Sequence, residues 1–153
     1  MSARRLLRLI VVIGAGLSGA MLAACVAPAL SYGAYEGKAA ASAESSLAAA
    51  RTAILAARTA DLGRLPGTYL AVVAEQAEGN ATSVEGQFSS IQPPDGRADG
   101  LRDQLRPLLA SAAELLELVR IHARRGELDA LGSVIARLAP VADALERFAE
   151  AHS

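Results

Sequence analysis

Very few residues of this 153-residue chain could do acid–base, nucleophilic or metal chemistry. The chain holds one cysteine, Cys25, and two histidines, His122 and His152. A nucleophile needs a base within hydrogen-bond reach, and neither histidine is well placed to be one. His122 falls on an apolar helical stripe, where a packing residue is expected, and His152 lies beside the chain end, where a solvated tail is expected. The sequence therefore predicts no catalytic residue, no metal site and no enzyme activity.

A glycine pattern near the start of the chain has the spacing of a dinucleotide-binding loop. The segment Gly14-Ala15-Gly16-Leu17-Ser18-Gly19 follows an apolar run, as in the turn that opens a phosphate-binding helix. Such a loop also needs a second strand that ends in an acidic residue about 20 positions later. Glu36 and Glu44 lie near that distance, but the sequence around them is Ala-rich and predicts helix. We therefore predict no dinucleotide cofactor.

The first 25 residues instead have the arrangement of an export signal. Three arginines precede the uncharged stretch 9–22, which has the length of a signal-peptide core. The segment Leu22-Ala23-Ala24-Cys25 resembles the lipobox of bacterial lipoproteins, in which an aliphatic residue and two small residues precede a cysteine. The resemblance implies attachment of a diacylglyceryl group to the Cys25 sulfur and cleavage before that residue. Two or more acyl chains on one residue would hold the protein stably on a membrane.

Two other arrangements of this segment also fit the sequence. No charged residue lies between Arg8 and Glu36, and about 20 apolar residues span a bilayer, so residues 9–30 could form an uncleaved anchor. Ala27-Pro28-Ala29 fits an ordinary signal-peptidase site, which would release a secreted protein. All three arrangements place residues 36–153 outside the cytoplasmic membrane. We expect the protein on the extracytoplasmic face of the cell membrane.

The rest of the chain predicts helices. Hydrophobic residues make up 52% of the sequence but aromatic residues only 3%, and the abundant Ala and Leu favour helix. Turn signals at 63–67, 92–96 and Gly126 separate stretches of similar length. Apolar residues recur every three or four positions, most regularly from Leu101 to His122 and from Leu128 to Ala149. The pattern favours an all-α fold, an antiparallel up-down-up-down four-helix bundle behind an N-terminal signal or anchor helix.

This organisation predicts three segments. Residues 1–24 are the expected signal peptide or membrane anchor, residues 25–37 a tether, and residues 38–153 the four-helix bundle. The first helix of the bundle is expected over 38–62. Alanine is so frequent there that the sequence indicates the apolar face less clearly than in the other three helices.

Several residues are expected to shape the helices locally. Pro107 and Pro140 lie inside apolar stripes, where the missing N–H predicts a kink. Gly79 and Gly86 share one helix face and predict close packing or a local break. Asp95 follows two prolines and is expected to cap a helix at a rigid turn.

The charge distribution gives one candidate contact surface. The net charge of −1 gives no indication of nucleic-acid binding. Arg120, Arg124 and Arg125 precede Gly126 at a predicted helix end, where cations offset the helix dipole. In a bundle of alternating helices Arg64 would lie near these three, at the end far from the membrane. We predict that the four arginines contact an anionic partner, either a cell-wall polymer or the acidic face of an envelope protein.

Together these features predict a protein of the cell envelope. Ala- and Arg-rich helices behind such a signal resemble, in general style, the small exported helical proteins of high-GC actinobacteria, a resemblance that brings no functional residues with it. The expected function is that of a membrane-tethered, non-enzymatic interaction module. The alternative is a helical bundle that binds a small ligand or a metal in a cavity near Pro107 and Pro140.

Overall fold

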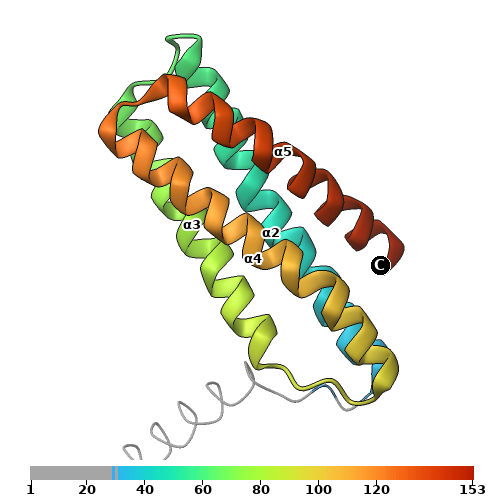
Figure 1. The fold of residues 1–153 in the computed structure, drawn as a ribbon. Helices are drawn as coiled ribbons and strands as arrows, with labels where there is room; N and C mark the ends of the chain where they lie inside the picture. Colours follow the sequence, from blue (N-terminus) through green and yellow to red (C-terminus); the bar gives the residue numbers. More distant parts are fainter. Residues whose placement is uncertain (1–28, 30) are drawn as a thin grey trace, which may run out of the picture.

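The computed structural model describes Ala29 and residues 31–153 of the chain. This part is all-helical, with four helices and no strand, as the sequence predicts (Figure 1). The helices are α2 (Tyr32–Asp61), α3 (Gly67–Ser90), α4 (Gly96–Arg125) and α5 (Leu128–Ala151). The arrangement is compatible with a four-helix bundle. The expected signal segment and Cys25 lie outside the described residues, and none of the four described helices is long and apolar enough to cross a membrane.

Each helix packs against two neighbours in a ring. Helix α2 contacts α3 and α5, and helix α4 contacts the same two helices. Helices α2 and α4 also touch across the middle of the bundle, whereas α3 and α5 share no contact among the described residues. Most of the residues that α2 buries are alanines, and these short side chains let α4 approach closely.

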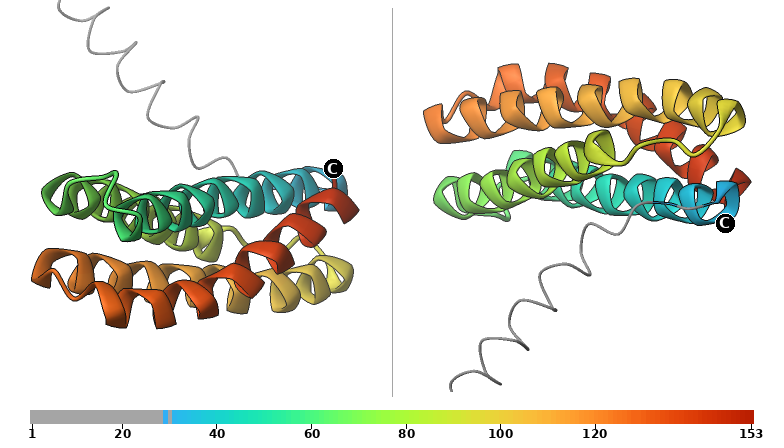
Figure 2. Two further views of the ribbon diagram at one scale, coloured as in Figure 1. Left: turned by 90° about the horizontal axis from the view of Figure 1, so that it is seen from above. Right: turned by 90° about the horizontal axis from the view of Figure 1, so that it is seen from below.

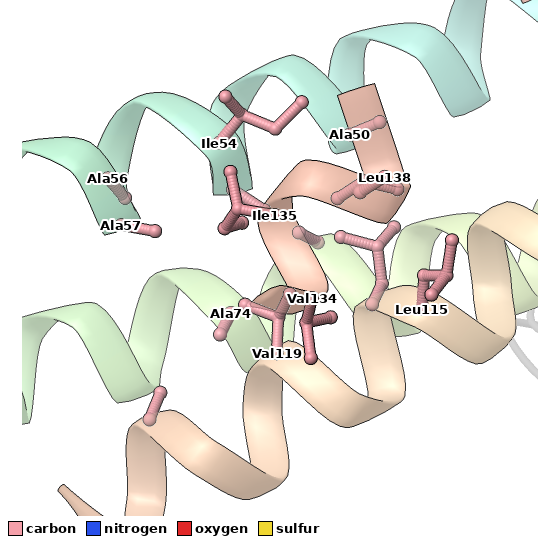
Figure 3. Close-up of a cluster of buried hydrophobic side chains, with 14 of the residues drawn as sticks. Ala50, Ile54, Ala56, Ala57, Ala74, Leu115, Val119, Val134, Ile135 and Leu138 are labelled. Carbon is pink, nitrogen blue, oxygen red and sulfur yellow. The ribbon is translucent and has the colours of Figure 1, made fainter. Parts of the chain in front are cut away.

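The core consists of two clusters of buried apolar side chains. One cluster includes Leu70, Leu116 and Leu138 and lies toward the α2–α3 and α4–α5 connections. In this cluster Ile135 of α5 lies toward Ile54 of α2 (Figure 3). The apolar stripes predicted for α3, α4 and α5 supply most of the large side chains in both clusters.

The second cluster lies toward the start of α2. It includes Tyr35, Phe88, Leu105 and Leu145, and the Tyr35 and Phe88 rings are 5.6 Å apart between centroids. Figure 2 shows the last turns of α5 beside the first turns of α2, where Phe148 joins the same cluster. The end of α5 therefore closes this end of the core.

Helix α2 begins at Tyr32 rather than near Lys38, so residues 32–37, expected in the tether, are helical. The Ser31 side chain starts the helix by accepting a hydrogen bond from the Ala34 N–H at 3.3 Å. Tyr35 then points into the core and is fully buried. The apolar contact of this tyrosine, together with the cap, extends the helix beyond the Ala-rich segment.

The ends of α4 confirm two local expectations. The Asp95 carboxylate accepts hydrogen bonds from the backbone N–H groups of Arg97 and Ala98, each at 3.0 Å, and so caps the helix. Gly126 ends the helix with φ of 70°, the left-handed conformation that a residue with a side chain rarely adopts. The α4–α5 connection needs only Gly126 and Glu127 as a result.

The glycines and prolines inside the helices lie at exposed positions. Gly79 and Gly86 lie within the continuous helix α3, and a Cβ at either position would meet nothing within 4 Å. They mark neither close packing within the chain nor a break. Pro107 and Pro140 are exposed within α4 and α5, where water can reach the carbonyl groups that lose their helical partners.

Candidate interaction surface

The arginine cluster predicted at the end of α4 is partly neutralised by helix α3. Nη2 of Arg124 lies 2.8 Å from Oε2 of Glu75. Nε of Arg120 lies 3.2 Å from Oε2 of Glu78, an ion pair whose N–H is not aligned for a hydrogen bond. These two arginines hold α4 against α3, and the expected concentration of unopposed positive charge is not present around them.

Arg64 and Arg125 differ from the other two arginines. Both are exposed, and neither forms an ion pair with another residue that the structure describes. Arg64 lies in the connection that follows α2, and Arg125 is the last residue of α4. Of the four arginines predicted to contact an anionic partner, these two keep their charge open to solvent.

His122 lies in the last turn of α4 and is partly exposed rather than buried in the core. Its Nδ1 is 2.7 Å from Oε2 of Glu127, the residue that precedes α5. Ala123, the next residue, fills the buried position of the stripe. The histidine is therefore a polar link across a tight turn.

His152 is not a solvated tail. Its Nδ1 is 3.0 Å from Oε1 of Glu36, and its ring lies 4.6 Å from the Phe148 ring. The Tyr32 hydroxyl donates to the same Glu36 oxygen at 3.3 Å, and the Arg97 guanidinium lies 4.4 Å from the centre of the Tyr32 ring. This cluster joins the end of α5 to the starts of α2 and α4. It offers a histidine and a carboxylate, and no group of three metal-ligating side chains occurs among the described residues.

Two buried hydroxyl groups have no hydrogen-bond partner. Tyr35 and Ser46 are both fully buried, and neither side-chain oxygen bonds to another described residue. Burial raises the pKa of the Tyr35 hydroxyl, with opposing smaller effects of Arg102 and of nearby aspartates. Both hydroxyls lie within the core, so they bear on stability rather than on chemistry at the surface.

No protein-family model, curated protein or solved structure matches this chain. The candidate site is therefore defined by the exposure, charge and contacts of the described residues.

The outward surface of helices α2 and α3 is the most unusual part of that surface, and we call it the α2–α3 face. It follows positions spaced by three or four residues along each helix, which share one side. On α2 it consists of Ala41, Ser45, Ala48, Thr52, Leu55 and Thr59. On α3 it consists of Tyr69, Val72, Val73, Gln76, Asn80, Ser83 and Gln87. None of these side chains carries a charge.

Two grooves run along the seam between the helices on this face. The larger, of about 540 Å³, is lined by the start of α2 and the end of α3, with Lys38 and Phe88 among its lining residues. The smaller, of about 230 Å³, lies between Thr52 and Val73. Ser45 lines both grooves, so the two hollows adjoin one another.

The hydroxyl groups on the α2 side of this face are used within the helix. Ser45 donates to the Ala41 carbonyl at 2.8 Å, and Thr52 and Thr59 donate to the carbonyl four residues earlier at 2.7 Å. A hydroxyl that bonds to a carbonyl of its own helix has less capacity left for a polar partner outside. The α2 half of the face is therefore less polar than its composition indicates.

Large apolar side chains are exposed on the same face. Leu55 is 68% exposed, Tyr69 59% and Val72 51%. Single exposed apolar side chains are common, but neighbouring ones on an uncharged, hollowed surface are typical of an interaction site.

The charged residues of the two helices lie along the edges of the face. On α2, Glu44, Arg51 and Arg58 follow one another at seven-residue spacing, and Arg51 pairs with Glu146 of α5. On α3, Glu75 and Glu78 pair with arginines of α4. That seven-residue spacing is visible in the sequence, but the sequence alone does not indicate which side of α2 packs against α3.

Proposed function

We propose that this protein is a membrane-tethered, extracytoplasmic interaction module of the cell envelope, without catalytic activity. The lipobox that ends at Cys25 supports a lipid tether, and residues 9–30 offer an uncleaved anchor as the alternative. In either case the tether enters the bundle at the start of α2.

The uncharged α2–α3 face is the observation that carries the interaction function. Charged residues make up 20% of the sequence, yet beyond Lys38 at one end they are absent from this face, while they occupy the exposed sides of α4 and α5. An exposed, hollowed and weakly polar face on an otherwise charged small protein is best explained by a partner that covers it.

We further propose that the bundle has up-down-up-down topology, with the α2–α3 and α4–α5 connections at the end far from the membrane. The short connections 62–66, 91–95 and 126–127 support antiparallel neighbours. The large groove supports it too, since the start of α2 and the end of α3 line it together. In this topology Arg64 and Arg125 face the cell wall, which leaves them free to contact an anionic polymer.

Photo-cross-linking in intact cells tests the interaction function directly. A photoreactive phenylalanine analogue replaces Gln76 on the α2–α3 face or, as a matched control, the exposed Gln104 on α4. We expect defined cross-linked products from position 76 and few or none from position 104. Products that are absent at position 76, or equal at both positions, would contradict an interaction function of this face.

A further inference from the structure

We propose that the last part of α5 opens as a unit at Pro140 while the rest of the bundle stays folded. We call this part, residues 141–152, the strap; it includes His152, which follows the last helical residue. Figure 2 shows the first half of α5 beside α4 and its last turns beside the start of α2. The inference is independent of the membrane tether and of the α2–α3 face, because it concerns neither.

The core changes from one cluster to the other along α5 close to Pro140. Leu138, before the proline, belongs to the cluster near the α4–α5 connection. Leu145 and Phe148, after it, belong to the cluster near the start of α2. Of the buried residues of the strap, Ala142 alone contributes to the first cluster. The proline therefore separates two parts of α5 that pack into different halves of the core.

Helix α2 has a weak point at the same boundary. Ala43 belongs to the cluster near the start of α2 and Ala49 to the other, and Ser46 lies between them in the sequence. Ser46 is fully buried with an unpaired hydroxyl, which lowers the stability of the layer that it occupies. Leu47 and Val141, which pack against both clusters, are only partly buried. Two halves of a core that are joined weakly can open separately.

Pro140 gives α5 a point at which it can bend. Proline has no N–H, so the carbonyl group of Ala136 lacks its helical hydrogen bond. Both residues are exposed, and water can reach that carbonyl group when the strap is closed. Opening at this position therefore breaks one helical hydrogen bond fewer than opening elsewhere in α5.

Two polar contacts hold the strap closed, and both reach α2. Arg51 forms an ion pair with Glu146, and these side chains are 53% and 36% exposed. Nδ1 of His152 lies 3.0 Å from Oε1 of Glu36. No hydrogen bond or ion pair joins the strap to α4 among the residues that the structure describes. Exposed ion pairs contribute little to stability, so the apolar side chains of the strap supply most of what keeps it closed.

The strap buries fewer large apolar side chains than the part of α5 before it. Leu145 and Phe148 are the large buried side chains of the strap. The preceding part of the helix buries Leu131, Val134, Ile135 and Leu138. A segment with fewer buried apolar contacts opens at a lower cost in free energy. Opening of the strap gives water access to the cluster that contains Tyr35 and Leu105, so the closed strap covers a latent apolar surface near the start of α2.

Cysteine labelling of the detergent-solubilised full chain tests where α5 opens. Leu145→Cys and Leu138→Cys form a matched pair, because both leucines are fully buried and lie on the same stripe, after and before the proline. We expect a small thiol reagent to modify position 145 at least about tenfold faster than position 138 under native conditions. Equal rates would show that α5 opens only with the whole bundle and would overturn the inference. Mass analysis of the labelled peptides separates both positions from Cys25.

Hydrogen exchange of the unsubstituted full chain, resolved to single residues, separates an opening strap from a fraying helix end. We expect the amides of residues 144–148 to share one protection factor, at least about tenfold below that of residues 134–138. Protection that falls gradually from residue 144 toward residue 151 is fraying and would overturn the inference. This measurement needs no substitution, so it holds even where a cysteine variant fails to fold.

Restoring the missing backbone donor tests the hinge. Pro140→Ala allows a hydrogen bond to the Ala136 carbonyl group, and Pro107→Ala makes the same change at an exposed position inside α4. We expect Pro140→Ala to lower the ratio of the labelling rates at positions 145 and 138 by at least about threefold, because the strap is then coupled to the turn before it. Pro107→Ala is expected to leave the ratio unchanged. An unchanged ratio in Pro140→Ala, or an equal fall in both variants, would overturn Pro140 as the hinge.

Discussion

Replacing Ser46 with alanine should stabilise the protein, because the serine hydroxyl is fully buried and lacks a hydrogen-bond partner. Leaving such a group unpaired costs about 1 to 3 kcal/mol, and alanine adds about 0.5 kcal/mol of helix propensity. We therefore expect the free energy of unfolding to rise by about 1.5 to 3.5 kcal/mol. For a domain of this size that corresponds to a melting temperature higher by about 6 to 14 °C.

The neighbouring Ser45 provides the matched control for this measurement. Ser45 is exposed, and its hydroxyl bonds to the Ala41 carbonyl at 2.8 Å. In Ser45→Ala the gain in helix propensity offsets the lost hydrogen bond, so the net change should be close to zero. Thermal unfolding of the full chain in detergent, followed by circular dichroism, compares the two variants. If Ser46→Ala is no more stable than Ser45→Ala, the buried hydroxyl does not lower the free energy of unfolding. The description of this part of the core would then be wrong.

Three further predictions concern other sites. Because burial raises the pKa of Tyr35 in the folded protein, the unfolded chain loses this proton first, and stability should fall as the pH rises above about 10. Tyr35→Phe should make that fall smaller in urea unfolding at alkaline pH, and an unchanged fall would contradict the assignment. Asp95→Ala should lower the free energy of unfolding by about 1 kcal/mol through loss of the α4 cap. Asp103→Ala, inside the same helix, should change it little, and equal effects of the two substitutions would argue against capping. Gly79→Ala and Gly86→Ala should each raise the stability of the protein by about 0.5 to 1 kcal/mol, since a Cβ meets nothing at either site, and a loss of stability would show that the space is filled.

Features that depend on local sequence could be predicted. Asp95 after two prolines and Gly126 after a run of arginines mark the ends of α4, and the structure has both caps. The apolar stripes of α4 and α5 also follow from spacing alone, because the side chains of these helices differ strongly in polarity between faces.

Features that depend on which helix faces meet could not be predicted. Glu36 and His152 are 116 residues apart, and no spacing rule relates them. The same holds for the glutamates of α3 that neutralise Arg120 and Arg124, since a pair between helices depends on their relative height and rotation. In α2 alanine lies on every side, so hydropathy does not indicate which surface is buried.

The α2–α3 face depends on local sequence and also on which helix faces meet. The absence of charge from its positions can be read from the sequence, as can the seven-residue spacing of Glu44, Arg51 and Arg58. That these positions form one surface depends on α2 and α3 being neighbours, with Ser45 and Thr52 on the side toward Val73. Prediction of this face therefore needs the packing of the helices as well as the sequence.

The intact mass of the mature protein, extracted from membranes, tests the proposed tether most directly. We predict a chain that begins at Cys25 and carries a diacylglyceryl group on that residue. A membrane-bound chain that retains residues 1–24 would contradict the lipid anchor in favour of a transmembrane one. A soluble chain that begins after Ala29 would contradict a membrane tether altogether.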